Sequence, residues 1–187
     1  MLRVDADLWQ AVQDKLRSNL QGHKTRATAI NPSLLTGLAF DDQGHRLTPT
    51  HAKKGARRYR YYVSRPLHAA GRDAAPEALR WPAQELEQAV LQSLKGFLTD
   101  ESRLMGLMAK IDATEVRRRL KHARGLAEKL ALTQSAEQIN VLQRVIDRVT
   151  VHSDKIQIAV NADAVWSSIP VSDDEKTTTL IDMPVQL

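Results

Sequence analysis

The stretch that decides the fold is residues 44–66, GHRLTPTHAKKGARRYRYYVSRP. From Gln43 to Arg72 the chain carries eight Lys or Arg residues and no Asp or Glu, and its three tyrosines all lie between positions 59 and 62. Residues 1–42 are neutral and residues 73–187 have a net charge of −3, so the formal charge of +5 comes from this tract. Positive charge concentrated in this way and interleaved with aromatic side chains is typical of a nucleic-acid contact surface.

The tract also has the pattern of a small β-ribbon. The predicted strands are 34–40, 46–50 and 57–64, with turns at 41–44 and 53–55. Pro49 suits an edge strand because proline has no N–H to donate to a neighbouring strand. Alternation in the third strand places Tyr59, Tyr61 and Val63 on one face and Arg58, Arg60 and Tyr62 on the other. We expect the first face to close a small core and the second to meet a phosphate backbone.

The expected nucleic-acid contacts are the cations of the ribbon and one tyrosine. They are Arg46, Lys53, Lys54, Arg57, Arg58, Arg60, Tyr62 and Arg65. Phosphate contacts hold register but read no bases, and Arg46, His45 or Thr48 are the candidates to reach a groove edge. If roughly five phosphates are neutralised, log K against log salt has a slope of about −4 to −5. A solvated charged face is the other explanation, but a tract free of acidic residues favours binding.

The remainder of the chain is mainly helical and then returns to strands. Helices are predicted at 5–20, 82–98, 104–111, 112–130 and 135–149, strands at 150–152, 155–160 and 180–187, and irregular segments at 21–33, 66–80 and 170–179. Asp112 to Glu115 form a capping-box pattern at a helix start. Since the connection at 132–134 is short, we expect its two helices to form an antiparallel hairpin. The fold class is therefore α+β, a small antiparallel β-sheet with an inserted helical layer.

Several classes of function find no support in the sequence. There is no cysteine, so neither a disulfide framework nor a thiolate metal site is possible. His45 and His51 with Asp41 or Asp42 match no metal-ligand spacing, and Ser64, Ser167 and Ser168 have no evident base beside them. The sequence has no glycine-rich phosphate loop, no signal peptide and no apolar run near the roughly 18 residues that span a membrane. We expect no catalytic residue, metal or cofactor, and a soluble cytoplasmic protein.

Three segments of the tract carry a resemblance to a known family. They are 32–38 (PSLLTGL), 44–51 (GHRLTPTH) and 57–65 (RRYRYYVSR). Together they resemble the zinc-β-ribbon region of large serine recombinases, the phage-integrase and transposase branch of the resolvase/invertase family. Residues 7–12 (DLWQAV) are similar to the last helix of that family's preceding recombinase domain, and residues 81–87 (WPAQELE) to the helix after its ribbon. The hairpin from Thr114 to Val149 is similar to the family's coiled-coil insertion.

The resemblance implies four parts. These are the tail of a recombinase domain at 1–31, a ribbon with its following helix at 32–98, a helical hairpin at 99–149, and returning strands at 150–187. The family's zinc-binding cysteine positions hold Phe40, Gln43 and Ser64, so structural zinc is not expected. The catalytic serine domain of the family has no counterpart in the sequence. We therefore expect a piece of such a recombinase that does not cleave DNA alone, whether a split gene, a decayed gene or an engineered fragment.

The expected function is a DNA-binding and subunit-contact module of a site-specific recombinase, located with the nucleoid of a bacterium or phage. Its expected partner is double-stranded DNA, with self-association through residues 104–149 as a further possibility. Two other classes remain open from the sequence. One is a protein-interaction module in which the ribbon only aids solubility, and the other is an RNA-binding protein.

Overall fold

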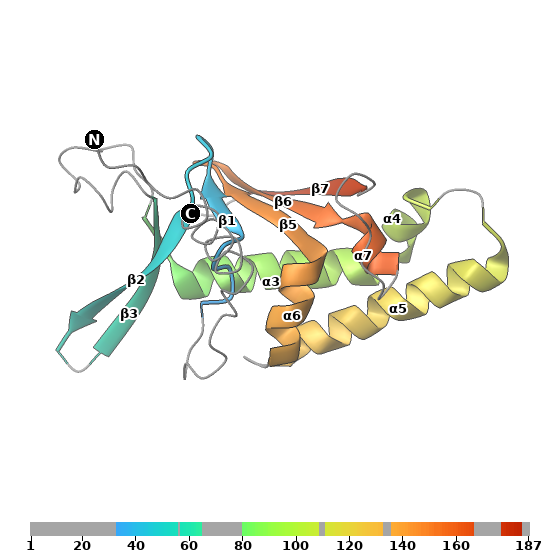
Figure 1. Cartoon of the computed structure of the whole chain (residues 1–187), viewed down its shortest axis with the longest axis horizontal. Helices are drawn as coiled ribbons and strands as arrows, with labels where there is room; N and C mark the ends of the chain where they lie inside the picture. Colours follow the sequence, from blue (N-terminus) through green and yellow to red (C-terminus); the bar gives the residue numbers. More distant parts are fainter. Residues whose placement is uncertain are drawn as a thin grey trace, which may run out of the picture. The chain divides into compact units, whose positions relative to one another are not determined.

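The computed structural model describes residues 33–55, 57–64, 80–108, 111–132, 136–166 and 177–184, which belong to one compact unit running from Ser33 to Leu187 (Figure 1). The described residues form helices and two β-sheets, which confirms the α+β fold class. The helix predicted at 5–20, the irregular segments 21–32, 66–79 and 170–176, and the expected contact Arg65 lie outside the described residues.

The basic tract forms a three-stranded antiparallel sheet in the order β2-β3-β4. Its strands are β2 (Leu47–Lys54), β3 (Arg57–Ser64) and β4 (Arg80–Pro82). The predicted strand at 57–64 is confirmed, whereas β2 runs four residues beyond the predicted end at Thr50. Pro49 does not interrupt β2, because β2 is the edge strand of this sheet. Gly55 makes the turn at the end of the ribbon with a positive φ of 62°, a conformation that glycine adopts without strain.

The second sheet is four-stranded and mixed, in the order β1-β5-β6-β7. Its strands are β1 (Ala39–Asp41), β5 (Ile146–Val151), β6 (Lys155–Asn161) and β7 (Thr178–Pro184). The strand predicted at 34–40 is wrong over residues 34–38, which form a turn, and β1 pairs in parallel with β5 rather than with the ribbon strands. The N–H of Val149 donates to the carbonyl of Leu38 at 2.8 Å, which fixes this register. The residues just before the basic tract therefore belong to the sheet built by the end of the described chain.

The helices are α3 (Ala83–Thr99), α4 (Glu101–Gly106), α5 (Ala113–Ala131), α6 (Ala136–Val145) and α7 (Ala162–Trp166). The cap predicted at Asp112 is confirmed, since its Oδ1 accepts the N–H groups of Thr114 and Glu115 at 2.8 and 3.0 Å. The helix predicted at 135–149 is too long, because β5 begins at Ile146. Buried residues at Ile146 and Val149 fit a helical spacing, but β-branched residues at 146, 149, 150 and 151 favour a strand.

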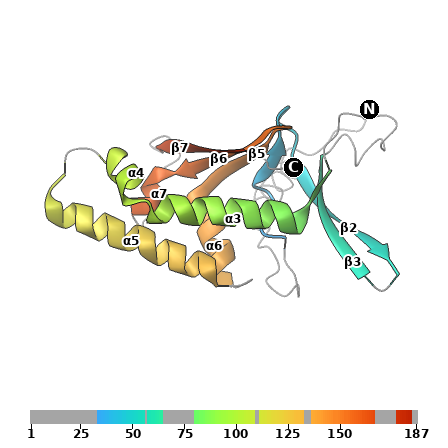
Figure 2. The ribbon, with the colours of Figure 1, turned by 180° about the vertical axis from the view of Figure 1, so that it is seen from behind.

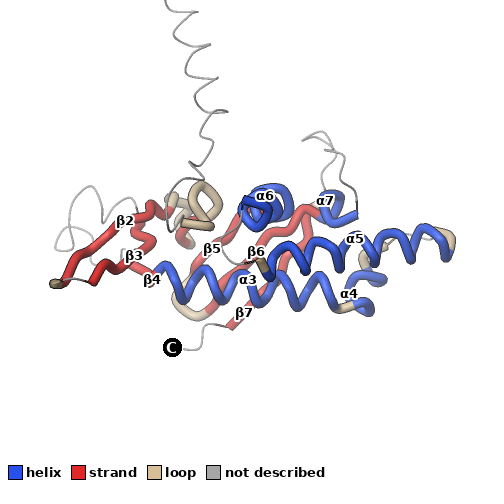
Figure 3. The backbone as a smooth tube through the Cα atoms, turned by 90° about the horizontal axis from the view of Figure 1, so that it is seen from below, coloured by secondary structure: helices blue, strands red, loops and turns tan. Residues whose placement is uncertain are grey.

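Helices α3 and α5 lie side by side and run in opposite directions (Figures 1 and 2). The view from below shows α6 crossing α5 instead of returning along it (Figure 3), and the Gln138 side chain on α6 donates to the carbonyl of Leu130 at 2.9 Å. The antiparallel neighbour of α5 is thus α3, and not α6 as the short connection suggested. The core joins α3, α5 and α6 to one face of the four-stranded sheet through aliphatic residues, among them Leu86, Val90, Leu94, Leu126, Leu142, Val149, Ile158 and Val160.

Candidate nucleic-acid interface

The outer end of the ribbon concentrates positive charge. Lys53 lies directly opposite Arg58, and Lys54 directly opposite Arg57. All four side chains belong to exposed residues, and none of them forms an ion pair with a described residue. We call these four residues the ribbon tip. Like charges directly across a strand pair repel each other, so the four cations of the ribbon tip destabilise the folded ribbon.

The inner end of the ribbon is fixed to α3 by a buried carboxylate. Oε1 of Glu87 accepts hydrogen bonds from the Tyr62 hydroxyl at 2.8 Å and from the N–H of Leu34 at 2.9 Å. Arg60 binds the same carboxylate with both terminal nitrogens, at 3.2 and 2.9 Å. The Tyr62 hydroxyl also accepts the N–H of Leu35 at 2.8 Å. We call this network the anchor, because it joins β3, α3 and the turn that precedes β1.

Tyr62 was expected to contact DNA, and that prediction is wrong. The side chain is completely buried in the anchor, with 0% of its surface exposed. Burial, followed by the charge of Glu87, raises the pKa of Tyr62 well above its usual range, so the hydroxyl stays protonated and keeps donating. The sequence did contain a signal for this arrangement. Glu87 falls on the apolar stripe of α3 between Leu86 and Val90, and a buried carboxylate needs partners of the kind that Arg60 and Tyr62 supply.

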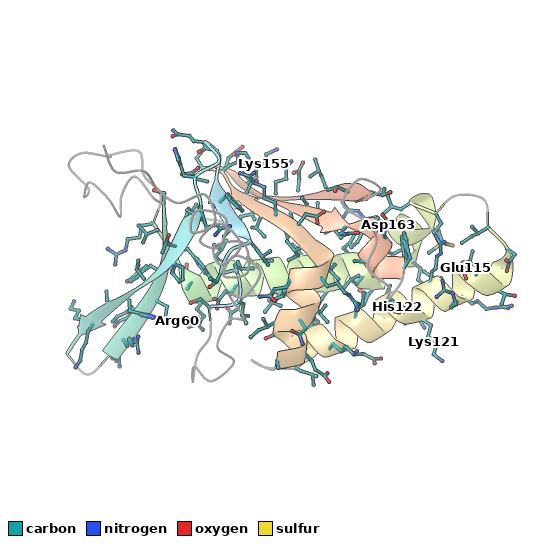
Figure 4. The ribbon with its side chains drawn as sticks, viewed as in Figure 1. Arg60, Glu115, Lys121, His122, Lys155 and Asp163 are labelled. Atoms are coloured by element: carbon teal, nitrogen blue, oxygen red, sulfur yellow. The ribbon has the colours of Figure 1, made fainter. Side chains whose placement is uncertain are left out.

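Arg60 was also expected to contact phosphate, but the structure gives it another role. Its guanidinium forms a two-pronged ion pair with Glu87, and 17% of its side chain remains exposed. Figure 4 shows Arg60 on the ribbon, on the part nearer α3. An arginine held by a buried carboxylate keeps little capacity for a phosphate, so Arg60 belongs to the anchor and not to the contact surface.

The opposite face of the ribbon also differs from its prediction. Tyr59 was assigned to the ribbon core, yet 40% of its surface is exposed. Tyr61 is partly covered, with the Arg80 guanidinium 3.9 Å from its ring centroid. Tyr59 lies between Arg57 and Tyr61 on this face, so an exposed aromatic ring is available next to the cations of the ribbon tip.

Arg46 and His51 lie near the ribbon without joining the anchor. Arg46 is exposed and lies 5.7 Å from the ring centroid of Phe40, which Arg148 approaches to 4.1 Å. His51 is exposed and directly opposite Arg60. Burial, then the charges of Arg58 and Arg60, lower the pKa of His51 below its ordinary value. The imidazole is therefore mainly neutral at pH 7 and can donate a hydrogen bond without adding charge.

The three positions that hold cysteine in the resembled family have other roles here. Phe40 forms a bridge with Arg46, Gln43 lies in the turn after β1, and Ser64 pairs with Leu47. The Ser64 hydroxyl is buried and has no hydrogen-bond partner among the described residues. His45 and Asp41 form a local pair, with Nδ1 and Oδ2 3.2 Å apart. No group of three or more His, Asp or Glu side chains within the described ranges is arranged to hold a metal ion.

Two general findings complete the description of the site. Within the described ranges, no helix combines the length and the apolar character that crossing a membrane requires. No protein-family model matches the chain, and the searches of curated proteins and of solved structures give no match either.

Proposed function

We propose that this chain binds duplex DNA through its ribbon tip and serves as a DNA-binding and subunit-contact module of a large serine recombinase. The observation that carries the proposal is the pairing of Lys53 with Arg58 and of Lys54 with Arg57, with no acidic residue between Gln43 and Arg72. Cross-strand pairs contribute roughly 0.2–1 kcal/mol each, and pairs of like charge act against folding. A polyanion placed on the ribbon tip removes that repulsion and gains the charge contacts.

The shape of the site also supports duplex binding. A two-stranded antiparallel ribbon is one of the elements that the major groove of B-DNA admits. The anchor ties the ribbon to α3 through a buried ion pair and hydrogen bonds, so little ordering is left to occur on binding. Tyr59 adds an exposed ring beside the cations. The expected contact set therefore becomes Arg46, Lys53, Lys54, Arg57, Arg58 and Tyr59.

The role in a recombinase rests on the family resemblance of the ribbon, and the subunit contact rests on the helices as well. Met105 and Leu107, at the end of α4, are 49% and 39% exposed, and Leu132 after α5 is 46% exposed. Met105 and Leu107 lie close together at the end of α4 and offer an apolar contact to another subunit, whereas Leu132 lies at the other end of α5. Strand cleavage is not part of the proposal, and Ser64 is buried.

Fluorescence anisotropy over a series of salt concentrations tests the DNA-binding proposal. With the five cations of this contact set on phosphates, log K against log salt has a slope of about −4.5. The ribbon variant Lys53→Gln, Arg57→Gln, Arg58→Gln is expected to reduce the magnitude of that slope by about 2 to 3.

The matched control also removes three positive charges, but from residues that already form ion pairs. It is Arg118→Gln, Arg124→Gln, Lys155→Gln, whose partners are Glu115, Glu101 and Asp182. The control is expected to keep the wild-type slope. Absent or salt-insensitive duplex binding by the wild-type protein contradicts the proposal, and tighter binding to RNA than to the duplex assigns the ribbon to RNA instead.

A further inference from the structure

A second basic surface lies on α5, away from the ribbon. Six Lys or Arg residues and two Glu residues fall within Ala113–Ala131, a net charge of +4 that the acidic total of residues 73–187 conceals in the sequence. The basic residues are Arg117, Arg118, Arg119, Lys121, Arg124 and Lys129. All of them except the half-buried Arg119 are exposed. At 3.6 residues per turn, Arg117, Lys121, Arg124 and Glu128 share one side of the helix.

Three of these six cations already have ion-pair partners within the protein. Glu115 binds Arg118 at 2.6 Å and Arg119 at 2.8 Å, and Arg124 pairs with Glu101 on α4. The hydrogen bonds from Arg118 and Arg119 lower the pKa of Glu115 to about 2, so this carboxylate is charged at any physiological pH. Arg117, Lys121 and Lys129 form no ion pair with a described residue. We call these three residues the α5 track.

The spacing of the α5 track is unfavourable for an isolated helix. Arg117 and Lys121 are four residues apart and of the same sign, as are Arg118 and Lys121 at three residues. Like-charge neighbours at these spacings destabilise a helix by about 0.2–0.5 kcal/mol per pair. A helix face that only needed solubility would more often alternate Glu with Lys. The α5 track repeats the arrangement of the ribbon tip, with like charges placed side by side.

The positive field extends to the junction of α5 with α6. Burial lowers the pKa of His122, and the charges of Arg144, Arg118 and Lys129 lower it further. The Nε2 of His122 and the Nε of Arg144 are both buried without a hydrogen-bond partner among the described residues. Figure 4 shows the Lys121 side chain pointing out from α5, on the side away from the four-stranded sheet. Arg117 and Lys121 thus present positive charge on one exposed side of α5, and Lys129 adds a charge about 120° around the helix, on the side of His122.

The composition of this face favours a nucleic acid over a protein. Between Thr114 and Lys129, every exposed residue of α5 is polar or charged. Stable protein interfaces have an apolar, often aromatic core, whereas phosphate contacts need only cations and donors. Arg117 and Lys129 are 12 residues apart on one helix, or about 18 Å at 1.5 Å per residue. That length corresponds to about five base pairs of duplex at about 3.4 Å each.

The α5 track runs toward the ribbon. Because α3 and α5 are antiparallel, the end of α5 that carries Lys129 is the end nearer to β2 and β3 (Figures 1 and 2). We propose that the α5 track is a second phosphate-contact surface for the same duplex that the ribbon tip binds. This inference rests on the proposed DNA binding, and it predicts a longer footprint than the ribbon alone provides.

The experiment compares three variants, each of which removes three positive charges, on a duplex of about 30 base pairs, long enough for both surfaces. They are the ribbon variant and the ion-paired control described above, and the α5 variant Arg117→Gln, Lys121→Gln, Lys129→Gln. Three lost phosphate contacts reduce the magnitude of the salt slope by about 2.7. On a duplex of about 10 base pairs, which the ribbon alone fills, the α5 variant is expected to match the wild type.

The outcomes separate the two proposals. If the ribbon variant loses slope and the α5 variant keeps the wild-type slope on the long duplex, the α5 inference is overturned and ribbon binding stands. If the ribbon variant keeps the wild-type slope, the proposed function fails first. If the α5 variant keeps the DNA slope but loses binding to poly-L-glutamate, the face belongs to an acidic protein partner and the inference is also overturned. An unchanged far-UV circular dichroism spectrum of the α5 variant excludes unfolding as the cause of weaker DNA binding.

Discussion

The two ends of the ribbon use the same residue types for opposite purposes. Arg58 and Arg60 are two positions apart on one face of β3, opposite Lys53 and His51. Arg60 reaches a buried carboxylate on α3, whereas Arg58 has no acidic residue within the tract to pair with. The comparison shows that the acidic partner, and not the arginine, decides whether a cation stabilises the fold or remains available to a ligand.

Removal of Glu87 gives the largest expected effect, because it breaks the anchor at its centre. Glu87→Ala leaves Arg60, the Tyr62 hydroxyl and the N–H of Leu34 without their shared acceptor. Loss of one partner of a buried ion pair costs about 3–5 kcal/mol of unfolding free energy. Urea denaturation measures the loss. Glu85→Ala is the matched control, on an exposed position of the same helix, and is expected to cost less than about 1 kcal/mol. Equal losses for the two variants contradict the anchor.

Single substitutions in β3 sharpen the comparison between the two arginines. Arg60→Gln removes a charged partner of Glu87, and is expected to cost about 1.5–3 kcal/mol of stability with little change in the salt slope of DNA binding. Arg58→Gln should leave the stability within about 0.5 kcal/mol and reduce the magnitude of the slope by about 1. Denaturation and anisotropy on the same two proteins check both halves. If Arg60→Gln reduces the salt slope and Arg58→Gln reduces stability, Arg60 belongs to the DNA interface and Arg58 to the fold.

Tyr62→Phe tests the hydroxyl within the anchor. The substitution leaves the buried N–H of Leu35 without an acceptor, at a cost of about 1–3 kcal/mol. Since the pKa of Tyr62 is raised in the folded protein, the stability contributed by its protonated hydroxyl is complete below the ordinary value of 10.0 and is lost as pH rises above it. The wild-type protein therefore loses stability more steeply than Tyr62→Phe above pH 10. If the stabilities of the two proteins fall in parallel above pH 10, the Tyr62 hydroxyl is solvent-exposed and the anchor is contradicted.

The smallest expected effect has the opposite sign. Lys53→Glu replaces a repulsive cross-strand pair with an attractive one to Arg58, which is expected to raise stability by about 0.2–1 kcal/mol. The same change weakens DNA binding because it places a carboxylate on the contact surface. Thermal denaturation and anisotropy measure the two effects. A variant that is both less stable and unchanged in affinity contradicts the proposed function of the ribbon tip.

Local pattern was sufficient for much of the fold. The apolar stripe of α3, the cap at Asp112 and the bounds of β3 each depend on residues within one element, and each is confirmed. The predicted alternation of β3 is wrong, because burial increases along the strand toward α3. Errors arose where distant residues decide the outcome. Tyr62 was assigned to the solvent face because the period of a strand shows only which residues share a face. It does not show that Glu87, on a distant helix, accepts a hydrogen bond from the Tyr62 hydroxyl.

The same reasoning explains a further failure of prediction. The end of α6 at Val145 depends on strand pairing between β5 and β6, which overrides a helical spacing of buried residues. The positive charge of α5 does not show in the net charge of residues 73–187, because acidic residues elsewhere in that stretch offset its cations, whereas a sum over the helix alone gives +4.

The parallel pairing of β1 with β5 has a consequence for how the chain reaches its native state. Ala39 bonds alongside Val149, so the first described strand leaves the ribosome well before its neighbour is synthesised. Non-local pairing of this kind slows folding, because the entropy cost of closing a long loop comes before the stabilising contacts form. Leu34 and Leu35 belong to that early segment, and their N–H groups donate to the Glu87 carboxylate and to the Tyr62 hydroxyl. The contacts of Arg60 and Tyr62 with Glu87 need no later strand, so the ribbon and α3 can assemble first, whereas β1 is paired only after β5 has been synthesised.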